Sequence, residues 1–212
     1  MSDRAVLSRR QVLAGVGGVA AGLAFGVPAA ARTGQVTDDG WPAVGAARIT
    51  QHRIEGSDAV VALLPGPTAA VLLHVARRFH YEVDALAAGE ATGYRGAGDR
   101  HHRSGTALEL RPGSYPAGAA GNLYPQQLAM VRDILAECDG VVRWGGDDPA
   151  RPMEGHFRID VPPGDARLHQ LVARLEQWAD EPDQGAGVAV DPAAPDRRQA
   201  SITLQRRQAG PR

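Results

Sequence analysis

Residues 101–110 read His-His-Arg-Ser-Gly-Thr-Ala-Leu-Glu-Leu and join a polar, glycine-rich loop (89–103) to a short apolar segment. The apolar segment, 106–110, has the length and composition of a β-strand. Gly105 permits a turn at the junction, and such a turn brings the His102 imidazole back over the strand. We therefore expect His102 and the Glu109 carboxylate to lie on the same face.

The segments on either side predict a domain that mixes helices and strands. Apolar residues recur every three or four positions in the stretches 69–86, 125–138 and 165–178, which is the spacing of amphipathic helices. Short apolar or alternating stretches predict strands at 48–55, 60–64, 106–110, 141–144 and 156–161. The predicted fold class is α+β, with one domain of about 130 residues.

The first 31 residues have the three parts of an export signal. Arg9 and Arg10 precede an uncharged, glycine-diluted stretch at 12–27, and the small residues at 29–31 suit a cleavage site. Paired arginines before a weakly hydrophobic core predict the twin-arginine route. We expect an exported protein, extracellular or in the periplasm or cell wall. No stable transmembrane segment is expected once 1–31 are removed, because the apolar run is shorter than a bilayer requires.

The remainder divides into a leader, a domain and a tail. Residues 32–47 are rich in Gly and Ala and predict a flexible leader, whereas 48–180 form the predicted domain. Residues 181–212 begin as a linker rich in Pro, Asp and Gly and end in an arginine-rich tail. Within that tail, 201–205 has the composition of an isolated strand.

Composition excludes several classes of function. The 212 residues carry a formal net charge of -1, so no nucleic-acid partner is expected, since such proteins favour a basic surplus. Cys138 is the only cysteine, which excludes a disulfide framework and any multi-cysteine metal site. Every basic residue is arginine, so lysine chemistry is excluded as well. A metal site in this chain must use histidine and carboxylate.

Two histidines and one carboxylate are candidates for such a site. His102 and Glu109 offer a nitrogen and an oxygen, and His156 begins a predicted strand after an acidic loop. Two imidazoles and one carboxylate form a common catalytic Zn2+ set that leaves one position open for water. The alternative is that these histidines only satisfy hydrogen bonds within loops.

The pattern His102-x-x-Gly105-x-Ala107-x-Glu109 resembles a known family motif. It is similar to the first motif of the zinc D-alanyl-D-alanine carboxypeptidases of the VanY type. The same motif marks the L-alanyl-D-glutamate endopeptidases, which share the hedgehog-like fold of those enzymes. In the family the second ligand of this motif is usually aspartate, one methylene shorter than Glu109.

A second motif follows in the expected order. Residues 144–147 read Trp-Gly-Gly-Asp, and His156-Phe157 comes twelve positions after the tryptophan. The resemblance extends over 93–160, about a third of the chain. It implies a hedgehog/DD-peptidase fold, in which a small antiparallel sheet is flanked by helices.

The resemblance also implies roles for individual residues. His102, Glu109 and His156 take the positions of the zinc ligands. Arg95 takes that of a catalytic-site arginine that binds a carboxylate or carbonyl of the substrate, and Asp147 is a further candidate contact. The substrates implied are the stem peptides of peptidoglycan.

The catalytic carboxylate is missing from its usual place. The family carries it three residues before the second histidine, where this chain has Met153, and a thioether cannot accept a proton from water. Glu154 is the first candidate substitute, and Asp147 the second. Neighbours in an extended segment point to opposite faces, so Glu154 faces away unless the loop is rearranged. A smaller departure is Arg100, where the family has serine.

Three hypotheses follow from the sequence. The first is an active exported zinc peptidase that uses Glu154 or Asp147 as its base. The second is a domain of the same fold that no longer hydrolyses peptides and binds zinc, a wall peptide or a protein partner. The third is an unrelated secreted domain in which the motifs match by chance.

Overall fold

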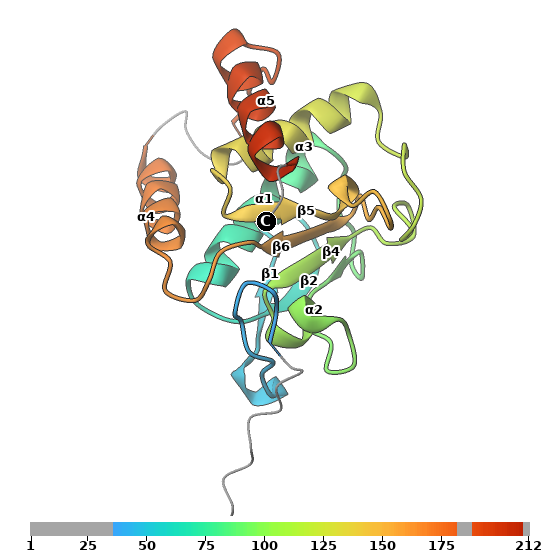
Figure 1. Ribbon diagram of the computed structural model, residues 1–212, viewed down its shortest axis with the longest axis vertical. Coiled ribbons are helices and arrows are strands. Elements are labelled where there is room, and N and C mark those ends of the chain that lie inside the picture. Colours follow the sequence, from blue (N-terminus) through green and yellow to red (C-terminus); the bar gives the residue numbers. More distant parts are fainter. Residues whose placement is uncertain (1–35, 182–187, 210–212) are drawn as a thin grey trace, which may run out of the picture. The chain divides into compact units, whose positions relative to one another are not determined.

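The computed structural model describes residues 36–181 and 188–209 (Figure 1). The predicted export signal, 1–31, lies outside the described residues, and so does the start of the predicted leader. Residues 182–187 of the predicted linker and the last three residues are also outside them. Within the described ranges the chain has the predicted α+β class, with small antiparallel sheets and helices.

The main sheet has four antiparallel strands in the order β3-β4-β6-β5. They are β3 (Ala91–Thr92), β4 (Ala107–Leu110), β6 (His156–Ile159) and β5 (Val142–Trp144). A separate pair is formed by β1 (Thr50–Arg53) and β2 (Val60–Leu63). The strands predicted at 106–110, 141–144 and 156–161 are therefore confirmed, and the last of them, β6, lies between the other two.

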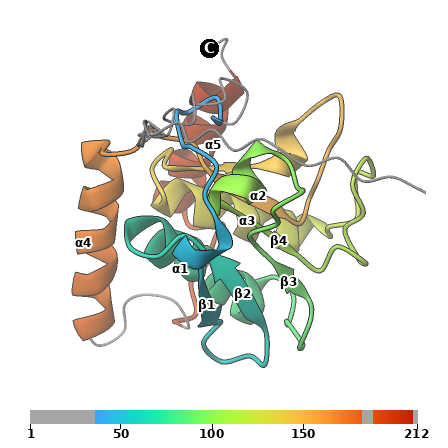
Figure 2. The ribbon, with the colours of Figure 1, turned by 90° about the horizontal axis from the view of Figure 1, so that it is seen from below.

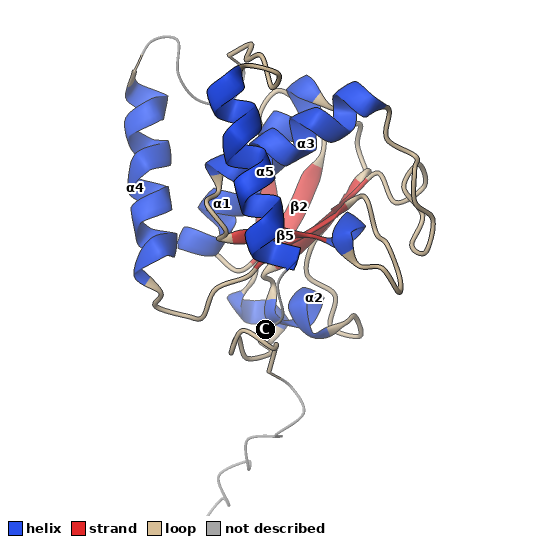
Figure 3. Ribbon diagram, turned by 45° about the horizontal axis from the view of Figure 1, so that its top comes forward, coloured by secondary structure: helices blue, strands red, loops and turns tan. Residues whose placement is uncertain are grey.

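Helices cover the strands (Figure 3). The described helices are α1 (Pro67–Glu82), α2 (Arg100–Ser104), α3 (Pro125–Glu137), α4 (Ala166–Asp180) and α5 (Pro195–Ala209). α1 and α3 pack on one face of the main sheet, α4 lies beside α1, and α5 packs on α3 (Figures 1 and 2). The three helices predicted from apolar spacing correspond to α1, α3 and α4.

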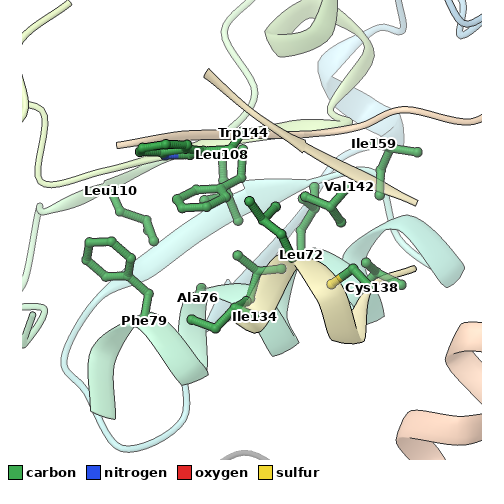
Figure 4. Close-up of a cluster of buried hydrophobic side chains, with 14 of the residues drawn as sticks. Leu72, Ala76, Phe79, Leu108, Leu110, Ile134, Cys138, Val142, Trp144 and Ile159 are labelled. Atoms are coloured by element: carbon green, nitrogen blue, oxygen red, sulfur yellow. The ribbon is translucent and has the colours of Figure 1, made fainter. Parts of the chain in front are cut away.

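The core lies between the main sheet and its two covering helices (Figure 4). Its fully buried side chains include Leu72 and Phe79 from α1, Ile134 from α3, Leu108 and Leu110 from β4, and Ile159 from β6. Each such side chain stabilises the fold by about 1.5–3 kcal/mol. Side chains alternate along a strand, so a β4 that points Leu108 and Leu110 into the core presents Glu109 on its other face.

The tail is the clearest correction to the sequence prediction. Residues 201–205, predicted as an isolated strand, lie inside α5. Leu204 is the one residue of this helix that is buried, so the helix has no apolar stripe that a sequence pattern could reveal. Arg197 instead connects α5 to α3 by ion pairs with Asp133 (2.5 Å) and Glu137 (2.8 Å).

Two other segments are more ordered than their composition indicates. The predicted loop 89–103 contains β3 and α2. In the predicted flexible leader, Trp41 is buried and its indole Nε1 donates to the carbonyl of Val161 at 2.7 Å. Across 36–181 and 188–209, no helix combines the length and the apolar character needed to cross a membrane.

Candidate metal centre

Strand pairing brings one predicted carboxylate beside one predicted histidine. Glu109 of β4 is directly opposite His156 of β6 in the antiparallel register, so their side chains share the face away from the core. Both residues are buried, with exposed fractions of 7%. The sheet therefore joins residues that are 47 positions apart in the sequence.

The short helix α2 positions the other histidine. The Asp99 carboxylate caps this helix by accepting from the backbone N–H groups of His101 (2.9 Å) and His102 (3.0 Å). At the other end, Gly105 adopts a φ of 71°, and a Cβ there would lie 2.8 Å from the backbone nitrogen of Leu64. Glycine is thus required at the turn that the sequence predicted.

The His102 ring is held in one orientation. It is fully buried, and its Nδ1 lies 2.6 Å from the carbonyl oxygen of Gly93, to which it can only donate. In the neutral ring this leaves Nε2 as the nitrogen that carries the lone pair, and Arg95 Nη2 lies 2.9 Å from it. A backbone carbonyl in this position is the usual support for a metal-binding histidine.

Three donor atoms converge at this point. Asp99, His102 and His156 each contribute one ligand atom, and all three atoms lie within 4.8 Å of one another. The His102 and His156 ring centroids are 5.4 Å apart, and Asp99 Oδ2 is 3.7 Å from His102 Nε2. The His156 Nε2 is buried and has no hydrogen-bond partner among the described residues. A buried, unpartnered nitrogen is costly unless a ligand completes it.

The local electrostatics favour the protonation states that a metal needs. Burial lowers the pKa of both His102 and His156 below the ordinary histidine value, so both rings are neutral near neutral pH. Burial opposes the charged form of Asp99, but the hydrogen bond from the His102 amide and the two nearby histidines outweigh it and lower its pKa. Two neutral imidazoles and one carboxylate match the donor set preferred by Zn2+.

The third donor differs from the sequence prediction. Glu109 was predicted as the carboxylate ligand, but the group of converging donors contains Asp99 in its place. Glu109 Oε2 accepts instead from Arg95 Nη2 at 2.9 Å, and the same Nη2 lies 2.9 Å from His102 Nε2. The Arg95 cation therefore lies between the predicted oxygen ligand and one of the histidines. Asp99 was missed, although an aspartate three residues before His102 is the usual signal of a helix cap.

The two candidate bases are engaged elsewhere. The buried Glu154 carboxylate accepts from the backbone N–H of Gly121 (2.8 Å), from that of Asn122 (2.9 Å) and from the Asn122 side-chain amide (2.8 Å). Asp147 makes a bidentate pair with Arg132, at 2.5 and 2.6 Å. Glu154 therefore anchors the loop around 121–122, in agreement with the expectation that it faces away, and neither carboxylate is free to accept a proton from water.

The glycines of the second motif permit a close crossing of the chain. A Cβ on Gly145 would lie 2.7 Å from the carbonyl oxygen of Met153, and one on Gly146 would overlap the Trp144 ring. Trp144 Nε1 donates to the carbonyl of Glu154 at 2.7 Å. These contacts hold the 145–155 loop over the strand on which His156 lies.

Two cavities flank the donors. One, of about 330 Å³, is lined by His156, His101 and Trp144 among others. The other, of about 510 Å³, is lined by Arg95 and Glu109 among others. Both are lined in part by Asp99, Arg151 and Met153. Of the three donors, Asp99 therefore borders both cavities, His156 borders one, and the buried His102 borders neither.

Comparison of the chain with protein-family models, with curated proteins and with solved structures finds no match.

Proposed function

We propose that this chain is an exported zinc peptidase-like protein with a hedgehog/DD-peptidase fold that acts on peptidoglycan stem peptides. The convergence of Asp99, His102 and His156 around a buried, unpartnered His156 Nε2 carries the proposal. The strand order also supports it, because the two motifs that resemble this family lie on adjacent strands. Glu109 is opposite His156, and Trp144 is opposite Phe157.

His102, His156 and Asp99 would hold the zinc. When bound, zinc supplies a Lewis acid for a scissile carbonyl and lowers the pKa of a water molecule. The Gly93 carbonyl keeps His102 Nε2 directed at the metal position. Arg95 holds a second carboxylate, that of Glu109, beside the donors, and the two cavities leave room for peptide on either side.

Zinc analysis of the purified protein, together with peptide cleavage, tests the proposal. We expect about one zinc per chain, removed by His156→Ala, and cleavage of a pentapeptide ending in D-Ala-D-Ala or of an L-Ala-D-Glu muropeptide. Zinc stoichiometry well below one in the wild-type protein would overturn it.

Two conservative variants separate the roles of the two carboxylates. Asp99→Asn and Glu109→Gln each replace one carboxylate with an amide of similar size. We expect Asp99→Asn to lose zinc and Glu109→Gln to retain it, because Asp99 is the carboxylate that converges with the histidines. The reverse result would return the ligand role to Glu109. Glu154→Gln is the matched third variant, and we expect it to retain zinc.

The second candidate function is a zinc-holding domain that binds wall peptide without cleaving it. Met153 at the usual position of the base favours it, and so do the three hydrogen bonds that occupy Glu154. Survival of both peptides in the presence of zinc-loaded wild-type protein would select this second function.

A further inference from the structure

The two cavities beside the donors share one solvent-exposed arginine, Arg151, that has no ion-pair partner among the described residues. Four arginines line these cavities, and three of them are paired with carboxylates. These pairs are Arg95 with Glu109 (2.9 Å), Arg143 with Asp160 (3.1 Å) and Arg158 with Asp39 (2.8 Å). The fourth, Arg151, lines both cavities, and its guanidinium has no hydrogen bond or ion pair with any residue in the described ranges.

The backbone around Arg151 is nevertheless fixed. The Asp148 Oδ1 accepts from the backbone N–H of Arg151 at 3.2 Å, and the Gly118 N–H donates to the carbonyl of Pro152 at 2.7 Å. The Met153 N–H donates to the carbonyl of Gly145 at 3.0 Å. The loop therefore holds the start of the Arg151 side chain between the two cavities, while its charged end is left for a ligand.

None of the acidic side chains that line the cavities forms an ion pair with Arg151. Glu109 is paired with Arg95, and Asp147 is paired with Arg132. Asp148 accepts two backbone hydrogen bonds within its own loop. Asp99 caps α2 and belongs to the donor group. The exposed Arg151 guanidinium is therefore available to an anionic group of a ligand in these cavities.

We propose that Arg151 binds a carboxylate of a peptide that lies across the two cavities. This inference rests on the proposed function for the peptide, but it moves carboxylate recognition from Arg95 to Arg151. Arg95 Nη2 already contacts Glu109 and His102, whereas all five N–H donors of Arg151 are available. A guanidinium and a carboxylate form paired, charge-assisted hydrogen bonds, which lysine cannot reproduce.

A stem peptide offers this chemistry at its C-terminus and at its acidic residue. Isothermal titration calorimetry on the chelator-treated full chain measures binding without turnover. The probes are an acetylated pentapeptide ending in D-Ala-D-Ala, the same peptide with a C-terminal amide, and the same peptide with its glutamate carboxylate amidated.

We expect one of the two amidations to weaken binding to the wild-type protein by about tenfold, in line with the size of hydrogen bonds to charged groups. That amidation identifies the carboxylate that Arg151 binds. Arg151→Gln should bind the acid and amide forms equally, and Arg151→Lys should retain part of the preference. Arg206→Gln is the matched control, because Arg206 is exposed on α5, lines neither cavity and should leave the preference unchanged.

Equal binding of all three peptides to the wild-type protein, including no binding by any, overturns this inference. So does an acid preference that persists in Arg151→Gln. Cleavage in the zinc-loaded protein is scored separately. If the acid form is preferred only when Arg151 is present and no peptide is cleaved, this inference holds and hydrolysis is rejected. If peptide is cleaved without that preference, hydrolysis holds and this inference is rejected.

Discussion

Two clusters of ionisable side chains differ in how completely their polar atoms are paired. In the helix cluster, Arg78 of α1 contacts Asp133 (3.1 Å) and Glu137 (2.8 Å), and Arg197 of α5 contacts the same two carboxylates. No side-chain atom of these four residues is buried without a partner. In the candidate metal centre of Asp99, His102 and His156, by contrast, the buried His156 Nε2 has no partner within the described chain.

This difference in the pairing of buried polar atoms distinguishes a cluster that only stabilises the fold from a candidate ligand-binding site. Opposite charges within hydrogen-bond distance offset the cost of burying Arg78 and Asp133, so the helix cluster is complete without any ligand. The candidate metal centre keeps two neutral imidazoles and a carboxylate close together, and His156 Nε2 is the donor that has no partner among the described residues, whereas His102 Nε2 lies 2.9 Å from Arg95 Nη2. A fold retains such an arrangement where a ligand completes it, and the number of unsatisfied buried atoms therefore distinguishes the two clusters.

Breaking the helix cluster should have the largest effect. Arg78→Ala leaves the buried Asp133 and the partly buried Glu137 with less positive charge around them, and removing one partner of a buried pair such as Arg78–Asp133 costs about 3–5 kcal/mol. We expect urea unfolding to show a loss of that order. Zinc stoichiometry should not change, because Arg78 touches none of the donors.

The control for Arg78 is an exposed pair in the same protein. Arg53 and Asp58 are 3.0 Å apart with side chains 70% and 82% exposed, and such pairs contribute about 0–1 kcal/mol. Arg53→Ala should therefore leave the unfolding free energy within about 1 kcal/mol of wild type. A similar loss in both variants would show that burial does not set the strength of the helix cluster.

Completing the metal centre should have the next largest effect. Zinc at a hundred times its dissociation constant should raise the unfolding free energy by about 2.7 kcal/mol, because it binds only the folded state. Thermal unfolding with and without zinc measures the shift. His156→Ala should abolish the shift while the metal-free variant remains folded. A zinc-dependent shift that survives in this variant would place the metal elsewhere.

Lowering the pH should reduce the unfolding free energy through the two clusters in different pH ranges. This is the smallest of the expected effects. Burial favours the neutral form of Glu137, but its hydrogen bonds with His74 and Arg197 and the charge of Arg78 lower its pKa from 4.5 to about 2. Between these values the unfolded chain holds a proton that the folded chain does not. Stability from Glu137 is therefore complete above pH 4.5 and is lost as the pH falls toward 2.

The metal-free histidines should act at higher pH. Their pKa values are lowered from 6.5 by burial, so the unfolded state binds protons first and stability falls as the pH drops below 6.5. Each group contributes a slope of at most about 1.4 kcal/mol per pH unit. Urea unfolding across pH 7 to 3 should show the two regions. Glu137→Gln should flatten only the lower one, and flattening of the upper region would contradict this assignment.

Local sequence patterns were sufficient for much of the fold. Apolar residues at helical spacing predicted α1, α3 and α4, and short alternating stretches predicted β4, β5 and β6. These signals work because a side chain that packs into a core must recur at the period of its own element. α5 carries no such signal, since its contacts are mainly ion pairs to residues about sixty positions earlier.

The candidate site divides in the same way. His102 and His156 could be singled out from their motifs, and Gly105 from the turn that it requires. Asp99 could not be recognised as the converging carboxylate, because its place beside His156 depends on α2 packing against the main sheet. The same holds for Arg95, whose contacts with His102 and Glu109 join a loop, a helix and a strand.

The sequence by itself determined the donor chemistry of this protein: histidine and carboxylate in a chain without lysine and with a single cysteine. It also determined the α+β class, because the apolar spacing of helices and the alternation of strands are both encoded in neighbouring residues. Only the tertiary structure decided which carboxylate converges with the two histidines, which groups bind the Glu154 carboxylate and which cavity arginine has no partner among the described residues. Those outcomes depend on how segments far apart in the sequence pack together. Which charged groups then pair with one another cannot be read from neighbouring residues.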